Sequence, residues 1–250
     1  MQNLAKTTVL ITGASRGLGV SIARTCAEQG AKLVLHYGRN HAGMEKLRAE
    51  LGASVLGVLS SDLSQPNVGT EIWQQAQKIA PDLNALVNNA GSADPVDFAT
   101  SDEDWQAGWA KTLAINLQAP ADLCRAAIAS FTKANGGPIV NIASRAGQRG
   151  DQMDLGAYAA SKGALLALTR TIAKGAAAQG VMAYAIAPGW IDTEMAPTDK
   201  QIRGKAVAEI PYGDFADPAE IAALTAFLLS GACPSATGAT FDVNGASYLR

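Results

Sequence analysis

A tyrosine and a lysine, Tyr158 and Lys162, stand four positions apart in the stretch "DLGAYAASKGALLAL", residues 154–168. On a helix, residues at this spacing share one face, one turn apart. A tyrosine hydroxyl has an ordinary pKa of about 10, too high for efficient proton transfer near neutral pH. A neighbouring ammonium group stabilises the phenolate and lowers that pKa. The pair therefore suits proton transfer to a substrate oxygen, although the same spacing also fits a core tyrosine beside a surface lysine.

A serine completes a possible reaction site. Ser144 ends the apolar run "GPIVNIAS" (137–144), fourteen positions before Tyr158. When a carbonyl accepts a hydride, negative charge develops on its oxygen and a proton is needed there. A serine hydroxyl can donate a hydrogen bond to that oxygen, in the manner of an oxyanion hole. The three residue types together fit the reduction of a carbonyl group.

A glycine-rich turn, "TGASRGLG" (12–19), lies between an apolar run and a helical pattern. Gly13 would permit a tight turn, Gly17 would let the backbone approach a pyrophosphate, and Gly19 would let helix and strand pack closely. The free N–H groups at the start of the helix attract such an anion. A tight turn without a ligand is the alternative.

The end of the second apolar run bears on which dinucleotide would bind. NAD sites usually place an Asp or Glu there to bind the ribose hydroxyls. Here the run ends "LVLHYGRN", with no acid before Glu45. Arg39, joined by Arg16 of the glycine-rich turn, would instead pair with a 2′-phosphate. We therefore predict NADP(H) as the preferred cofactor, with NAD(H) possible; two solvated surface arginines are the alternative.

These residues need a scaffold, and the hydrophobic pattern predicts one. Helical patterns separate short apolar runs, and 102–134 fits one helix or two, interrupted near Pro120. Continuous apolar strands alternating with helices predict a parallel sheet covered on both faces. We expect a seven-stranded, doubly wound α/β Rossmann fold in a single domain, 1–250. The expected strands are 7–12, 31–37, 54–63, 83–91, 137–144, 180–189 and 239–245, and the other helices 17–30, 41–51, 67–79, 155–178 and 218–230.

Composition excludes several classes of function. Hydrophobic residues make up 48% of the 250 residues, charged residues 17%, and the net charge is −2. Such a chain has no basic field for nucleic acid or an anionic membrane. Cys26, Cys124 and Cys233 form no CxxC pair and are expected as buried hydrophobic residues in a reducing compartment. With His36 and His41 as the only histidines, we expect no metal site, and without a signal peptide, a soluble cytoplasmic protein.

The motifs together resemble one family. "TGASRGLG", "NNAG" (88–91), Ser144, "YAASK" (158–162) and "APG" (187–189) occur in the order and approximate spacing of the short-chain dehydrogenase/reductase family, over essentially the whole chain. The resemblance implies that Tyr158 is the catalytic acid/base and that Ser144 binds the substrate oxygen. Lys162 would lower the pKa of the tyrosine and hold the nicotinamide ribose, and Asn116 would support a proton relay through water to the lysine.

The residues themselves and the resemblance together give a set of cofactor-binding residues. Asp62 could accept a hydrogen bond from an adenine amino group, and Gly91 would let a cofactor ring approach closely. The full set is Gly13, Ser15, Arg16, Gly17, Leu18, Gly19, Arg39, Asp62, Leu63, Asn89, Ala90, Gly91, Tyr158, Lys162, Pro188, Gly189, Ile191 and Thr193.

The substrate is less constrained. The polar segment 190–216, with weak helical patterning, would form a substrate lid, and we name Arg149, Met153, Trp190 and Met195 as candidate substrate residues. The loop between Ser144 and Tyr158 is about one residue longer than usual in the family, and it is charged. The charged residues expected to border the pocket are Arg145, Arg149, Asp151 and Asp154.

The resemblance is broadest to 3-oxoacyl-[acyl-carrier-protein] reductase-like members, so a 3-oxoacyl thioester is one candidate substrate. A sugar, polyol or small ketone is another, and a non-catalytic dinucleotide sensor is an alternative of a different class. Residues that could face a carrier protein are Arg125, Lys133, Arg170 and Lys174. By analogy with the family we expect a homotetramer built on 102–134, 155–178 and the last strand; Asn244, where the family often has Asp, bears on those contacts.

Overall fold

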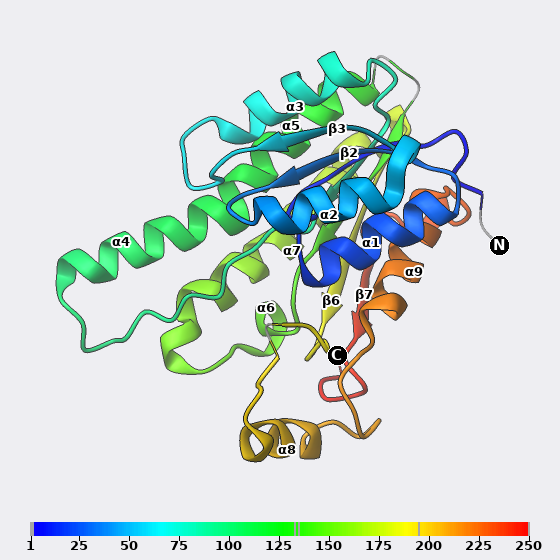
Figure 1. Cartoon of the computed structure of the whole chain (residues 1–250). Coiled ribbons are helices and arrows are strands. Elements are labelled where there is room, and N and C mark those ends of the chain that lie inside the picture. Colours follow the sequence, from blue (N-terminus) through cyan, green and yellow to red (C-terminus); the bar gives the residue numbers. More distant parts are fainter. Residues whose placement is uncertain (1–2, 133, 135, 195, 250) are drawn as a thin grey trace.

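The computed structural model describes residues 3–132, 134, 136–194 and 196–249. Within them, seven parallel strands form one sheet in the order β3-β2-β1-β4-β5-β6-β7. The predicted doubly wound α/β fold is confirmed (Figure 1). The strands are β1 (Thr8–Ile11), β2 (Lys32–Tyr37), β3 (Val55–Ser60), β4 (Ala85–Asn88), β5 (Gly137–Ile142), β6 (Val181–Pro188) and β7 (Thr240–Val243).

The helices follow the predicted ranges and include two additions. A short helix follows β5, and the polar segment 190–216 contains one whose first turn is capped by the Asp199 carboxylate, which accepts from the N–H groups of Gln201 and Ile202. The helices are α1 (Gly17–Glu28), α2 (His41–Leu51), α3 (Val68–Ile79), α4 (Asp102–Leu113), α5 (Ala119–Phe131), α6 (Ala146–Arg149), α7 (Gly156–Ala176), α8 (Lys200–Ala208) and α9 (Pro218–Leu229).

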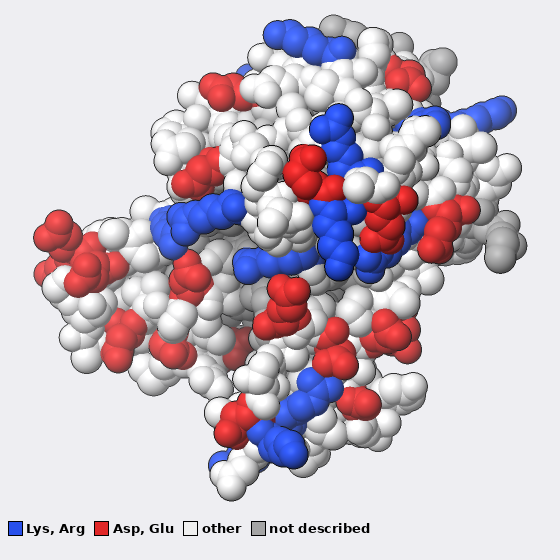
Figure 2. All heavy atoms as spheres, in the orientation of Figure 1, with Lys and Arg blue, Asp and Glu red and all other residues white. Residues whose placement is uncertain are grey.

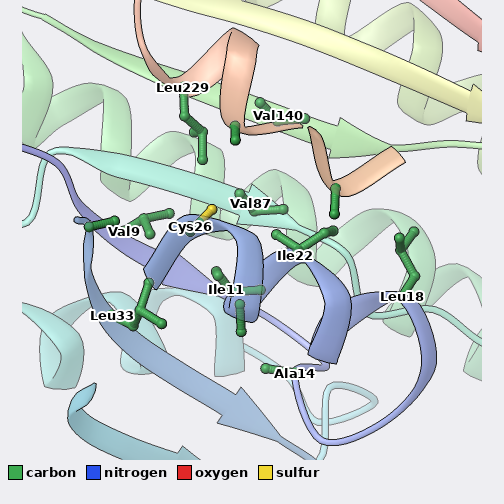
Figure 3. Packing of buried hydrophobic residues seen from close by; sticks show 14 of the residues in the cluster. Val9, Ile11, Ala14, Leu18, Ile22, Cys26, Leu33, Val87, Val140 and Leu229 are labelled. Carbon is green, nitrogen blue, oxygen red and sulfur yellow. The ribbon is translucent and has the colours of Figure 1, made fainter. Parts of the chain in front are cut away.

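Two hydrophobic cores lie on the two faces of the sheet. Side chains alternate along each strand, so Val9 and Ile11 of β1 point to one core and Leu10 points to the other. Helices α1, α2 and α9 close the first core, in which Ile22 and Cys26 lie against the sheet (Figure 3). Helices α3, α5 and α7 close the second. The sheet is thus buried on both faces, as its continuous apolar strands predict.

The strand order reverses beside β1, and this creates the place for a ligand. From β1 the chain builds outward to β2 and β3, then returns to pair β4 on the other side of β1. In open α/β sheets ligands bind in the crevice at the carboxyl ends of strands where this reversal occurs. The glycine-rich turn leaves β1 there, and the "NNAG" segment leaves β4 beside it.

The helical stretch between β4 and β5 is interrupted slightly before the predicted position. A π-helical segment, η2 (Ala114–Gln118), joins α4 to α5, and Pro120 lies in the first turn of α5, where proline is tolerated. Such π-turns are frequent at functional sites. Asn116, in the middle of η2, is fully buried. Helix α4 extends beyond the sheet, with Thr112 its buried residue (Figure 1).

Candidate active site

The backbone of the glycine-rich turn requires its glycines. Gly13 and Gly17 have positive φ angles of 66° and 53°, which side chains with a Cβ rarely adopt. A Cβ on Gly13 would lie 2.8 Å from the Cα of Ala90, and one on Gly19 would lie 2.1 Å from the carbonyl oxygen of Gly13. The turn therefore lies against the segment that follows β4 and against its own helix, and a Cβ would clash at Gly13 and Gly19.

Side chains from two other loops hold the turn in place. The Thr12 hydroxyl accepts hydrogen bonds from the N–H groups of Asn89 and Ala90, at 3.0 and 3.1 Å. The Asn89 amide donates to the carbonyl oxygens of Thr12 and Gly13, at 2.9 and 3.1 Å. Asn40, which the sequence analysis did not select, donates to the carbonyl of Ser15 at 2.9 Å. Asn89 therefore holds the backbone of the glycine-rich turn in its conformation.

A cavity of about 550 Å³ runs from the glycine-rich turn to Tyr158, along the carboxyl edge of the sheet. Every described residue of the predicted cofactor set lines it except Ser15, which is buried beneath the turn. Ser144 lines it as well. In Figure 2, Lys and Arg side chains gather with Asp and Glu around the middle of this face. Further lining residues, not selected from the sequence, are His36, Gly38, Asn40, Ser61, Ser92, Ala93, Asp94, Lys111, Ile115, Ile142, Ala143 and Glu194.

Lys162 is buried at one end of this cavity, with 4% of its surface exposed. Its ammonium donates a hydrogen bond of 2.8 Å to the carbonyl oxygen of Ile142, at the end of β5. Its Nζ lies 5.9 Å from the centre of the Tyr158 ring. Burial disfavours the charged form and lowers the pKa of Lys162 to about 8. Helix α7 therefore brings the predicted pair together, with the lysine anchored to the strand that ends near Ser144.

The pKa of Tyr158 is raised in this structure. Burial is the main cause, the charge of Asp151 adds to it, and a hydrogen bond with the Ser144 hydroxyl acts in the opposite direction. From the sequence we expected Lys162 to lower this pKa, but Lys162 is not among the groups that act on it, and its Nζ lies 5.9 Å from the ring centre. The hydrogen bond with Ser144 places the hydroxyls of Tyr158 and Ser144 side by side.

Asn116 is held by three hydrogen bonds. Its Oδ1 accepts from the N–H of Ser92 at 2.8 Å, and its Nδ2 donates to the Ser92 carbonyl at 2.8 Å and to the Ser161 hydroxyl at 3.0 Å. A Cβ placed on Gly91 would lie 3.3 Å from Lys162 Nζ and 3.4 Å from Asn116 Oδ1. Asn116 on η2 and Lys162 on α7 therefore both lie close to Gly91. Asn116 itself does not line the cavity.

A buried polar network lies beneath the site and was not predicted. Asn88 of β4 donates to Asn141 of β5 at 2.8 Å, and Asn141 donates to the Thr169 hydroxyl of α7 at 2.9 Å. Asn88 also approaches the sulfur of Cys124 at 3.3 Å. The sequence signal was an asparagine inside each of two apolar strands. Buried amides need partners, so the network fixes β4, β5 and α7 relative to one another.

The open end of the cavity carries exposed charges. Lys111 of α4 forms an ion pair with Asp94 at 2.8 Å, and about half of each side chain is exposed. Asp62 accepts hydrogen bonds from the N–H and hydroxyl of Ser64, and these lower the pKa of its carboxyl group. Arg16 and Arg39 are exposed. One oxygen of Asp62 is thus already engaged before any ligand arrives.

The candidate substrate residues that the structure describes do not line the cavity. Arg149 and Met153 are exposed and lie off the cavity, and Trp190 stacks on Phe215 with ring centres 5.7 Å apart. Arg145 is buried and donates to the hydroxyl of Ser247 instead of bordering the pocket. Met195 and Lys133 lie outside the described residues.

The three cysteines are not all buried, as the sequence analysis expected. Cys26 and Cys124 are buried, and burial raises the pKa of each thiol to about 12. Cys233 is exposed, in the segment before β7, so the expectation was wrong for this residue. Among the described residues, no group of three or more His, Cys, Asp and Glu side chains could hold a metal ion.

The glycine-rich turn lies where the strand order of the parallel sheet reverses, and a Ser, a Tyr and a Lys lie at the other end of the same cavity. This arrangement defines a dinucleotide-binding oxidoreductase. A family model described as enoyl-(acyl carrier protein) reductase matches residues 13–246. The chain belongs to the short-chain dehydrogenase/reductase family. It is therefore an oxidoreductase that acts on CH–OH or carbonyl groups of small molecules.

Three similar proteins cover nearly the whole chain. The 3-oxoacyl-[acyl-carrier-protein] reductase FabG of Vibrio cholerae is 32% identical, over 99% of both chains. Galactitol 2-dehydrogenase (L-tagatose-forming) of Cereibacter sphaeroides is 34% identical, over 94% of this chain and 92% of the relative. The crystal structure of a blue fluorescent protein from a metagenomic library, in complex with NADPH, is 32% identical with a TM-score of 0.90, over 99% and 100% of the two chains. No helix among the described residues is long and apolar enough to cross a membrane.

Proposed function

We propose that this chain is an NADP(H)-dependent oxidoreductase that interconverts a carbonyl group and a secondary alcohol, with Tyr158 as the acid/base. The observation that carries the proposal is the placement of Ser144, Tyr158 and Lys162 at one end of a cavity whose other end is the glycine-rich turn. That geometry joins a proton donor to a cavity of about 550 Å³ that extends from the glycine-rich turn.

The cavity fits NADP(H) on structural grounds. Gly13, Gly17 and Gly19 line it at the start of α1, where the free backbone N–H groups of a helix suit a bound phosphate group. Arg16 and Arg39 lie at the β2 end of the cavity, where residues 36–40 include no carboxylate. Guanidinium groups there suit a 2′-phosphate better than ribose hydroxyls. NAD(H) remains the alternative cofactor.

The residues that would hold the cofactor divide between the two ends of the cavity. Arg16, Arg39 and Asp62 would bind the adenosine half, and Lys162 and Thr193 the nicotinamide half. Bound NADP(H) supplies or accepts a hydride at its nicotinamide ring. Its ring in the oxidised state adds a positive charge, which would offset the burial that raises the pKa of Tyr158.

The chain's own side chains would handle the proton. The Ser144 hydroxyl donates a hydrogen bond to the substrate oxygen and the Tyr158 hydroxyl gives it a proton during reduction. The buried ammonium of Lys162 then stabilises the phenolate that remains. Asn116 fixes the Ser92 backbone and approaches Lys162, and this supports a role in the return of a proton from water.

For the substrate we propose a 3-oxoacyl thioester. The support is the likeness to 3-oxoacyl-[acyl-carrier-protein] reductase and the exposed cations Arg125, Arg170 and Lys174 on α5 and α7, which could meet an acidic carrier. A polyol or sugar is the second candidate, on the likeness to galactitol 2-dehydrogenase. The single-domain organisation, the lid over 190–216, the homotetramer and the cytoplasmic location stay predictions.

The test is a screen for NADPH oxidation over acetoacetyl thioesters, ketoses and small ketones, repeated with NADH at equal concentrations. We expect turnover of at least one thioester and a kcat/KM for NADPH at least about tenfold above that for NADH. A preference for NADH would contradict the cofactor assignment. Tight NADPH binding without turnover of any carbonyl or alcohol would favour a non-catalytic sensor.

A further inference from the structure

In the segment after β6, residues 189–193, alternate residues contact the cavity and the lid segment. Gly189, Ile191 and Thr193 line the cavity, while the intervening Trp190 and Asp192 do not. Trp190 stacks on Phe215 with ring planes 20° apart, and Asp192 accepts a hydrogen bond from Arg203 of α8. The stretch 189–193 therefore forms the cavity wall on one side and contacts later residues of the lid segment (190–216) on the other.

A pair of hydrogen bonds joins the two ends of the lid segment. The N–H of Ala216 donates to the Trp190 carbonyl at 2.9 Å, and the N–H of Asp192 donates to the Ala216 carbonyl at 3.0 Å. Ile191 and Ala216 form a parallel bridge. These bonds close the base of the lobe that carries α8, which stands apart from the sheet in Figure 1.

Arg203 connects the helix of this lobe to both ends of its base. Its Nη1 lies 2.8 Å from Asp192 and its Nη2 lies 3.8 Å from Asp214. Its guanidinium carbon lies 4.4 Å from the centre of the Phe215 ring, and that ring stacks on Trp190. The side chain is about one-third exposed, at 34%. In Figure 2 the same lobe carries Lys, Arg, Asp and Glu side chains close together.

These contacts are more specific than an ordinary surface ion pair. A single exposed pair contributes little to stability, and networks with flat arginine stacking contribute more. Within the lobe, the described buried hydrophobic residues are few and mostly small: Ala196, Ala206, Ile210, Phe215 and Ala216. The placement of α8 therefore depends strongly on the contacts that Arg203 makes with Asp192, Asp214 and Phe215.

We propose that Arg203 is a positioning residue that holds the lid helix α8 against its base and thereby fixes the cavity wall at Ile191 and Thr193. This inference rests on the proposed function, because it assigns that wall to the nicotinamide half of a cofactor site. Arg203 does not touch the cavity; it acts through Asp192 and through the Phe215–Trp190 stack. Its effect should therefore fall on the binding of cofactor and substrate before it falls on the chemical step.

The experiment compares Arg203→Gln, Arg203→Lys and the unmodified protein, with Arg24→Gln as the matched control. Arg24 forms an exposed ion pair with Glu50 at 2.6 Å, far from the lid in the fold, so its loss removes a surface pair of similar kind. The measurements are hydrogen exchange of the backbone amides of 200–208 without ligand, the Kd of NADPH by fluorescence, and KM and kcat for the best substrate of the screen.

For Arg203→Gln we expect exchange in α8 to become about five times faster, and the Kd of NADPH and the KM to rise about three- to fivefold. The kcat should stay within about twofold. Arg203→Lys keeps the charge but loses the planar fork, so its values should fall between those of Arg203→Gln and the unmodified protein. Arg24→Gln should match the unmodified protein in every measurement.

Two results would overturn the proposal. One is equal exchange in Arg203→Gln and Arg24→Gln, because Arg203 would then not hold α8. The other is faster exchange with an unchanged Kd for NADPH, because the lid would then not be coupled to the cavity wall. Neither result resembles failure of the proposed function, which would appear in the unmodified protein as a lack of NADPH binding or turnover.

Discussion

The two ends of the cavity are built in different ways. At the end of the cavity that β5 and α7 form, Ser144, Lys162 and the adjacent Asn116 are almost fully buried. Each makes hydrogen bonds to the backbone or to neighbouring side chains. At the end of β2 and β3, Arg39 and Asp62 are exposed. The first end is fixed by packing, and the second is open to solvent and salt.

This difference between the two ends fits two different roles, proton transfer and recognition of a phosphate. A proton donor needs a defined position and a controlled pKa, which burial and a polar network provide. Recognition of a phosphate needs charge and reach, which exposed arginines provide at lower cost in desolvation. Changes at the buried end should therefore alter kcat, and changes at the open end should alter affinity for the cofactor.

Apart from the loss of the Tyr158 hydroxyl itself, the largest expected effect is that of Lys162→Met at the buried end. The variant keeps the size of the side chain but removes the ammonium that stabilises the phenolate, so kcat should fall by about a thousandfold. Steady-state kinetics with the best substrate measures this, and circular dichroism checks the fold. Lys46→Met, an exposed lysine on α2, is the control and should keep kcat. An unchanged kcat in Lys162→Met would refute the assignment.

His36 is an exception at the open end of the cavity, because its side chain is buried there. Burial lowers its pKa from 6.5 to about 4, while the hydrogen bond with the Ser61 carbonyl acts in the other direction. Between these values the unfolded chain binds a proton that the folded protein does not. Stability should therefore fall as the pH drops from 6.5 to 4, by about 3 kcal/mol from this group.

Urea unfolding at several pH values measures this loss. His36→Gln cannot titrate, so its free energy of unfolding should depend less on pH in the same window. His41→Gln, an exposed histidine at the start of α2, serves as the control and should follow the unmodified protein. The same pH dependence in His36→Gln and the unmodified protein would contradict the burial argument.

A smaller effect is expected for Asn116→Ala. The alanine leaves the N–H and carbonyl of Ser92 without their partner, so the wall beside Gly91 should shift and kcat should fall by about thirtyfold. The Kd of NADPH should change by less than about threefold. Ser161→Ala removes one contact to Asn116 and leaves Ser92 bound, so it is the matched control. Equal kcat values in the two variants would show that the link to Ser92 has no catalytic role.

The smallest effect is expected at the open end. Arg39→Ser should weaken NADPH binding by about tenfold and leave NADH binding unchanged, because only NADPH carries the 2′-phosphate. Fluorescence titration with both cofactors measures this. Arg48→Ser, an exposed arginine later in α2, should change neither affinity. An equal loss of affinity for both cofactors would place Arg39 elsewhere in the site.

The buried end was more predictable from the sequence than the open end. Tyr158 and Lys162 share a helix, so local spacing places them together, and Ser144 follows from the end of an apolar strand. The reversal of strand order then brings the turn after β1 to the segment after β4. These inferences depend on short-range patterns and one topological rule.

The remainder depends on contacts between distant residues. Trp190, a candidate substrate residue, stacks on Phe215, 25 positions later in the chain. Asn40 and Lys111 reach the site through partners that no local pattern connects to them. The raised pKa of Tyr158 could not be predicted either, because it depends on how deeply α7 packs.

The most direct test of the account is the turnover of Tyr158→Phe at saturating NADPH with the best substrate of the screen. The variant keeps the ring and its packing and removes the hydroxyl that gives the proton. We expect kcat to fall by about a thousandfold or more while the Kd of NADPH stays within about threefold. Full kcat with the same NADPH affinity would show that Tyr158 is not the acid and that the chemistry lies elsewhere in the cavity.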